Sequence, residues 1–126
     1  MITMNFAHLF ERDDNTKELQ AGETLIEVGE TIDQMYVVLE GEAEIVIGEN
    51  SVETVKRGGL IGELSMVDRF PASATVKALS ELKVAIVDDR RFLFLIQQHP
   101  TFAVEVMKVM AFRLRRMDAR QEASDL

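Results

Sequence analysis

The residues most able to do chemistry lie between positions 58 and 76. Gly58, Gly59 and Gly62 precede Glu63, and glycine allows a backbone to approach a ligand closely. Residues 63–67 are expected to open a short helix, whose first N–H groups favour an anion. The carboxylate of Glu63 can accept hydrogen bonds from sugar hydroxyls, and Ser73 adds a hydroxyl group. Together these groups predict a pocket for a phosphate and a sugar, while plain turns remain the alternative explanation of the glycines.

Other kinds of reactive site have little support. The chain contains no Cys, which excludes disulfides, iron–sulfur clusters and thiolate zinc sites. His8 and His99 are the only imidazoles, and both lie outside the expected strands. No Ser is paired with a His in a recognisable nucleophilic arrangement. We therefore expect no metal site, no required cofactor and no enzymatic role.

The elements that must position residues 58–76 are predicted to be short strands. From position 23 to position 87, apolar runs alternate with turn residues at intervals typical of an antiparallel sandwich or barrel. In 43–47, glutamates alternate with apolar residues, so one face is expected to be wet and the other packed. The prediction is one domain over 1–126, mainly β with α, with a β-roll at about 19–87. Before it, Phe6, Leu9 and Phe10 predict a short amphipathic helix, and 11–16 is expected to be a loop.

After position 87 the apolar period changes from two to about 3.6, which predicts C-terminal helices at about 88–121. Asp88 or Asp89 is a suitable N-cap for a helix that ends at Pro100, and a second helix should begin near Thr101. The second helix carries a seam with a period of 3.5, made of Ala103, Met107, Met110, Leu114 and Met117. A neighbouring stripe consists of Phe102, Val106 and Val109. One stripe can pack on the roll and leave the other for a second copy or a partner protein; a single wide stripe buried on the chain's own body is the alternative.

Charge is distributed unevenly along the chain. The formal net charge is −8, with 7 Lys and Arg against 18 Asp and Glu in residues 1–89, and 7 against 4 in residues 90–126. An acidic body with a basic end is typical of self-association or of a partner for the basic end, although a solvated helix face gives the same pattern. The chain has no long apolar run and no signal-peptide pattern, so we expect a cytoplasmic protein without a membrane span.

The order of these motifs resembles the cyclic nucleotide-binding domain of the superfamily that includes the catabolite activator, protein kinase regulatory subunits and gated channels. About nine-tenths of the chain takes part in the resemblance. It rests on Ala21-Gly22-Glu23, Gly29, Tyr36-Val37-Val38-Leu39-Glu40-Gly41, the phosphate-binding cassette Gly62-Glu63-Leu64…Pro71-Ala72-Ser73-Ala74-Thr75-Val76, and the two C-terminal helices.

The resemblance implies an eight-stranded antiparallel β-roll of jelly-roll type, flanked by an N-terminal helix and two C-terminal helices, with the nucleotide between the roll and the last helix. It implies that Gly62 and Glu63 bind the ribose. The family's phosphate-binding Arg follows the cassette proline, where this chain has Ala72; Ser73 can still supply a hydroxyl and an N–H, and Arg69 is a candidate replacement. The candidate ligand-binding set is Ile61, Gly62, Glu63, Leu64, Ser65, Arg69, Ala72, Ser73 and Ala74.

The last helix is expected to complete the site. It has no Thr or Ser in residues 102–123 for base recognition, so Arg113 and Arg116 are candidate base contacts through cation–π stacking, with plain complementation of the helix C-terminus as the alternative. We expect a regulatory module that binds cyclic AMP or cyclic GMP and signals through this helix, as a homodimer or with a partner protein, without a DNA-binding domain. The alternative is a degenerate domain that has lost the nucleotide and serves as a dimerisation or protein-interaction module.

Overall fold

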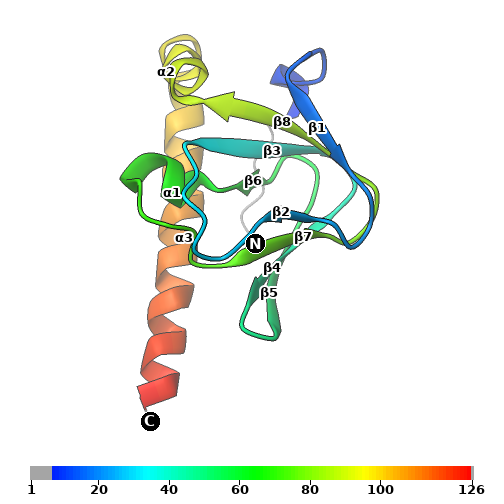
Figure 1. Cartoon of the computed structure of the whole chain (residues 1–126). Helices are drawn as coiled ribbons and strands as arrows, with labels where there is room; N and C mark the ends of the chain where they lie inside the picture. Colours follow the sequence, from blue (N-terminus) through cyan, green and yellow to red (C-terminus); the bar gives the residue numbers. More distant parts are fainter. Residues whose placement is uncertain (1–6, 126) are drawn as a thin grey trace.

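The computed structural model describes residues 7–125, with side chains described as far as Ala119. Eight antiparallel strands form two four-stranded sheets (Figure 1). One sheet has the order β1-β8-β3-β6 and the other β2-β7-β4-β5. The strands are β1 (Thr16–Leu19), β2 (Thr24–Ile26), β3 (Gln34–Glu40), β4 (Ala43–Ile47), β5 (Asn50–Val55), β6 (Leu60–Ile61), β7 (Thr75–Ala78) and β8 (Leu82–Asp88). The predicted mixed β-roll with α-helices is confirmed, and it begins three residues earlier than expected, at Thr16.

The strand β3 is buried on both faces, which explains its unbroken apolar sequence. Tyr36 and Val38 belong to the core inside the roll, whereas Met35 and Val37 belong to a second core on the other side of the same sheet. The helices cover this second side, so the sheet that contains β3 is the common wall of both cores.

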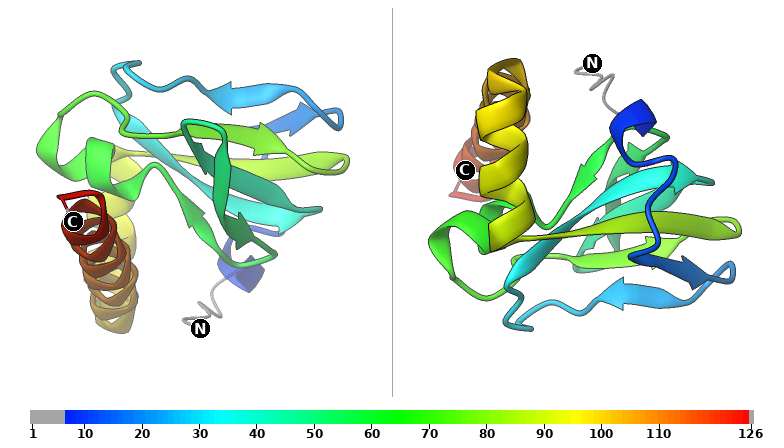
Figure 2. Two further views of the ribbon diagram at one scale, coloured as in Figure 1. Left: turned by 90° about the horizontal axis from the view of Figure 1, so that it is seen from below. Right: turned by 90° about the horizontal axis from the view of Figure 1, so that it is seen from above.

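Helix α1 (Glu63–Asp68) follows β6 directly and lies between the strands and the C-terminal helix (Figures 1 and 2). Its N-cap, Gly62, has a φ of 81°, a left-handed conformation that glycine adopts without strain. Its C-cap, Arg69, has a φ of 64° and donates its backbone N–H to Ser65. The predicted short helix in the cassette is therefore present, and a tight glycine turn starts it.

Helix α2 (Asp89–Gln98) begins where β8 ends. The Asp88 side chain accepts a hydrogen bond from the backbone N–H of Arg91 at 2.8 Å, so Asp88 is the predicted N-cap. Only His99 separates α2 from α3 (Pro100–Asp125), which runs along one side of the roll and extends past the strands (Figure 1). The helix stop at Pro100 is thus also the start of the next helix, where proline fits the first turn.

The predicted N-terminal helix lies only partly within the described residues. A single 3-10 turn, η1 (Ala7–Leu9), precedes Phe10, whose ring is fully buried in the second core. Phe6, the other aromatic residue of that prediction, lies outside the described residues. In residues 7–125 no helix is long and apolar enough to cross a membrane.

Candidate functional site

A pocket of about 660 Å³, including its open mouth, lies within the roll between α1, the cassette and α3. Its walls are mostly apolar side chains of the strands, and its polar groups come from the cassette, β5 and α3. The lining consists of Ile26, Ile32, Ile45, Ile47, Val52, Glu53, Gly62, Glu63, Leu64, Ser65, Ala72, Ser73, Ala74, Val76, Arg113, Arg116 and Met117.

Most of the cassette residues singled out in the sequence meet in this pocket. Seven of the nine candidates line it: Gly62, Glu63, Leu64, Ser65, Ala72, Ser73 and Ala74. Ile61 is fully buried in the core of the roll instead. Arg69 lies outside the pocket lining, where its half-exposed side chain pairs with Asp89 at the start of α2. The hypothesis that Arg69 replaces the missing cassette Arg is therefore not supported by its position.

Ala72 occupies the position from which a cassette Arg would reach into the pocket. Its backbone is held at both ends: its N–H donates to the carbonyl of Glu30 and its carbonyl accepts from Gly29, each at 2.8 Å. Its methyl group is buried and belongs to the core inside the roll. Two backbone hydrogen bonds thus hold the cassette at this point, and the cationic side chain of the family's Arg is absent.

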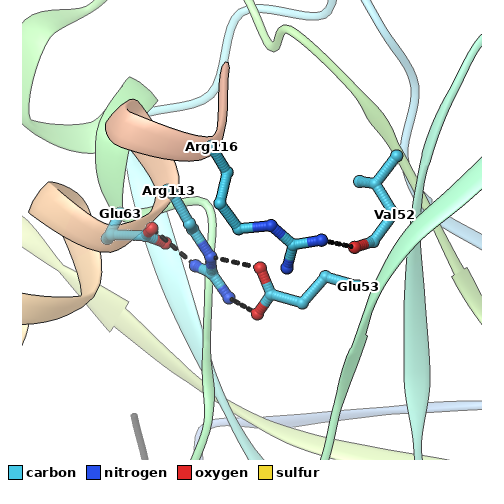
Figure 3. A network of polar contacts seen from close by, with 5 residues as sticks. All are labelled: Val52, Glu53, Glu63, Arg113 and Arg116. Atoms are coloured by element: carbon cyan, nitrogen blue, oxygen red, sulfur yellow. Dashed lines mark hydrogen bonds and ion pairs between the residues drawn. The ribbon is translucent and has the colours of Figure 1, made fainter. Parts of the chain in front are cut away.

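Glu63 is engaged in a buried ion-pair network (Figure 3). Its Oε1 accepts a hydrogen bond from Nη1 of Arg113 at 2.5 Å. Arg113 also donates from Nε and Nη2 to the two carboxylate oxygens of Glu53, at 3.1 and 2.8 Å. Because Glu63 is on α1, Glu53 on β5 and Arg113 on α3, this network fastens the C-terminal helix across the pocket.

The network keeps Arg113 charged although it is only 8% exposed. Burial by itself lowers the pKa of Arg113, but the charges of Glu63 and Glu53 and the hydrogen bonds to them outweigh that effect and hold the pKa above its ordinary value. One guanidinium is shared by two carboxylates, so the network carries a net charge of about −1. Such a group can accept hydrogen bonds from ligand hydroxyls and repels anions.

Arg116, one turn after Arg113 on α3, lines the same pocket. Its Nη2 donates to the backbone carbonyl of Val52 at 2.7 Å (Figure 3). Its guanidinium carbon lies 5.4 Å from the ring centre of Phe112. Both arginines predicted as base contacts therefore face the pocket. Sequence reasoning did not predict that two carboxylates hold Arg113.

The predicted seam on α3 is not a single exposed stripe. Phe102, Val106 and Val109 are buried on the roll. This agrees with the first alternative, in which one stripe packs on the roll and the other does not. Of the seam residues, Met107 and Leu114 are exposed, Ala103 and Met110 are half-buried, and Met117 lines the pocket. The stripe that does face outward consists of Val104, Met107, Ala111 and Leu114.

Comparison with known proteins agrees with this architecture. The sequence model of the cyclic nucleotide-binding domain matches residues 16–99. A candidate potassium channel protein of Rhodopseudomonas palustris is 29% identical over 113 residues, which is 87% of this chain and 27% of that protein. The chain thus spans about a quarter of the length of this relative.

Solved structures give the same fold. A structure described in work on a cyclic-GMP-dependent signalling pathway of bacterial phytopathogenesis superposes with a TM-score of 0.75 at 22% identity, covering 92% of this chain and 96% of the other. The catabolite activator protein of Thermus thermophilus superposes with a TM-score of 0.74 at 22% identity, covering 87% and 54%. With the β-roll, the cassette and the matched residues in place, this chain belongs to the cyclic nucleotide-binding domain family.

Proposed function

We propose that the chain is a regulatory module whose pocket binds cyclic AMP or cyclic GMP and reports the bound state through α3. One observation carries the proposal: Glu63 and Ser73 line a single pocket with apolar walls, and α3 closes one side of it. The ribose hydroxyls would donate to the carboxylate of Glu63, and the apolar strand residues would cover the base and sugar. A cytoplasmic location and the lack of an enzymatic role stay predictions.

The ion-pair network suggests how binding would reach α3. Oε1 of Glu63 already accepts a hydrogen bond from Arg113, so a ribose hydroxyl on the same carboxylate would weaken its hold on Arg113. A ligand can shift an equilibrium only by binding two states with different affinity. Here the two states would differ in how tightly α3 is held against α1 and β5. The output would pass to a second copy of the chain, or to a partner protein, through the outward stripe of α3.

Thermal unfolding with cyclic AMP, cyclic GMP and AMP at millimolar concentration tests this proposal. A ligand at 100 times its dissociation constant should stabilise the fold by about 2.7 kcal/mol, which is a rise of about 10 °C for a domain of this size. We expect a rise with one of the cyclic nucleotides and a smaller one with AMP. No rise with either cyclic nucleotide would contradict the proposal.

The second candidate function is an interaction module without a nucleotide. It is favoured by Ala72 in the place of the cassette Arg and by the apolar stripe that α3 exposes. If the natural protein shows no thermal response and Ala72→Arg creates one, the pocket is intact and has lost its ligand through this position. That result would favour the interaction module.

A further inference from the structure

The charged side chains that line the pocket differ in whether they have a partner of opposite charge. Four charged side chains line it: Glu53, Glu63, Arg113 and Arg116. The first three form one network in which every charged group has a charged partner. Arg116 instead donates to the neutral carbonyl of Val52. Within the part of the chain that the structure describes, no carboxylate forms an ion pair with Arg116.

Counting the lining charges shows what this means for an anion. The network contributes about −1, and Arg116 contributes +1, so the lining is neutral with Arg116 and negative without it. The cassette offers the methyl groups of Ala72 and Ala74, and the guanidinium of Arg69 is committed to Asp89. An anion that entered the pocket would therefore find one cation not already paired with a carboxylate, on α3.

Arg116 also has the donors to serve this purpose. A guanidinium carries five N–H groups, and the bond to Val52 uses one of them. Its side chain is half-buried, where a charge-assisted hydrogen bond to phosphate is stronger than in bulk water. Position, free charge and free donors thus coincide in one residue.

Building on the proposed function, we infer that Arg116 is the specificity-determining cation of the pocket: it binds the phosphate of the ligand in place of the missing cassette Arg. The single positive charge matches the single negative charge of a cyclic phosphodiester. A phosphomonoester such as AMP carries about two negative charges at pH 7 and would leave one of them beside a negative network. Arg116 therefore selects a monoanionic nucleotide, and its contact is to the phosphate rather than to the base.

Isothermal titration of cyclic AMP and cyclic GMP into the natural protein, Arg116→Gln and Arg115→Gln tests the inference. Arg115 is the matched control, because it is the exposed neighbour on the same helix and its replacement changes the net charge equally. We expect Arg116→Gln to weaken binding about 10- to 100-fold and to reduce its dependence on salt. Arg115→Gln should bind as the natural protein does. Arg116→Lys keeps the charge and should lie much closer to the natural affinity.

Ala72→Arg in the Arg116→Gln background tests whether the positive charge of Arg116, and no other property of that side chain, is responsible for binding. It returns a cation to the cassette, so it should restore the lost binding if Arg116 acts on the phosphate. Failure of this rescue, or equal affinities of Arg116→Gln and Arg115→Gln, would overturn the inference while nucleotide binding by the natural protein upholds the proposed function. If the natural protein binds neither nucleotide, both the proposed function and the inference fail, whether or not Ala72→Arg binds.

Discussion

Arg113 connects three distant parts of the chain through a single side chain, and its loss should be costly. Arg113→Met would leave Glu63, which is 1% exposed, as a buried carboxylate without its cation. Breaking a buried pair in this way costs about 3–5 kcal/mol. We expect urea denaturation to show a loss of that size, with little change for Arg115→Met on the exposed face.

The same network allows a stricter comparison. Replacing Glu53 and Glu63 by Gln in the Arg113→Met background removes all three charges, and neutral groups in place of a buried network are often tolerated. The triple variant should therefore be more stable than Arg113→Met alone. If it is less stable, the cost of the single variant comes from lost packing of the arginine and not from the stranded carboxylates.

Gly62 should be sensitive for a different reason, its backbone conformation. With a φ of 81°, an alanine there is strained, and its Cβ would lie 2.9 Å from Cδ1 of Ile32 in the pocket wall. Gly48→Ala is the matched control, since Gly48 has a φ of 64° but open space around the added Cβ. A left-handed alanine costs about 1–2 kcal/mol at either site. Thermal unfolding should show a larger loss for Gly62→Ala; equal losses would mean that Ile32 moves aside freely.

The sequence predicted the cassette half of the site and missed the network. Gly62, Glu63, Ala72 and Ser73 are close in sequence, so a local motif was sufficient to find them. Glu53 lies ten residues before Glu63, on strand β5 and outside the cassette, and nothing in its sequence neighbourhood distinguishes it from the other glutamates of the strands. Its role arises only when β5 and α3 close on the pocket. The hypothesis for Arg69 relied on its nearness in sequence, but the left-handed turn at this residue leads to Asp89 and away from the pocket lining.

At the level of elements, the buried face of α3 is longer than the apolar stripe that the sequence predicted. Phe102, Val106, Val109 and Arg113 follow spacings of four, three and four, and all are buried. The sequence analysis named Phe102, Val106 and Val109 as one stripe and did not extend this stripe to Arg113, which it named as a candidate base contact. Because Glu53 and Glu63 neutralise Arg113, the buried face extends to it, and the outward stripe is Val104, Met107, Ala111 and Leu114.

That stripe yields a prediction about assembly. If α3 pairs with a second copy, Leu114→Glu places a charge in the apolar contact and should give monomers by light scattering. Lys108→Glu introduces the same side chain at an exposed position of α3 outside the stripe and is the control. A natural protein that is already monomeric, or an unchanged mass for Leu114→Glu, would remove helix pairing through this stripe.

Two strands, β1 and β6, lack the alternation of apolar and polar residues by which strands are predicted. The edge strand β1 has the sequence Thr-Lys-Glu-Leu, and only its last residue is buried. The strand β6 has two residues, both buried, and is too short to show alternation. Such strands form because β8 and β3 offer free edges, which is information that a local window does not contain.

At the scale of the whole molecule, the sheet shared by the two cores should make the domain unfold as one unit. Tyr36 is the only tyrosine of the chain, there is no tryptophan, and Tyr36 lies in the core inside the roll. Phe102 is fully buried in the other core, about 6 Å from the rings of Phe10 and Phe92. Phe102→Ala should cost about 3–5 kcal/mol.

Two signals distinguish one unit from two. Tyrosine fluorescence reports the roll, and far-ultraviolet circular dichroism reports mainly the helices. We expect both midpoints to coincide and to fall together in Phe102→Ala. Phe70→Ala, at a ring that is 70% exposed, should leave both midpoints nearly unchanged. If only the circular dichroism midpoint falls, the helices unfold separately while the roll stays folded, and the domain is not one cooperative unit.

The connections on both sides of α2 are very short, and this determines how a tilt of α3 would be transmitted along the helix. No residue separates β8 from α2 and one residue separates α2 from α3, so a rigid-body tilt of the long helix would turn about a pivot near His99. At about 1.5 Å of rise per residue, Arg113 sits about 20 Å from that pivot and Asp125 about 38 Å from it. A displacement of α3 at the pocket would therefore be roughly doubled at its far end. If a ligand tilts α3 in this way, a partner bound near Asp125 would be displaced farther than the part of the helix that lines the pocket.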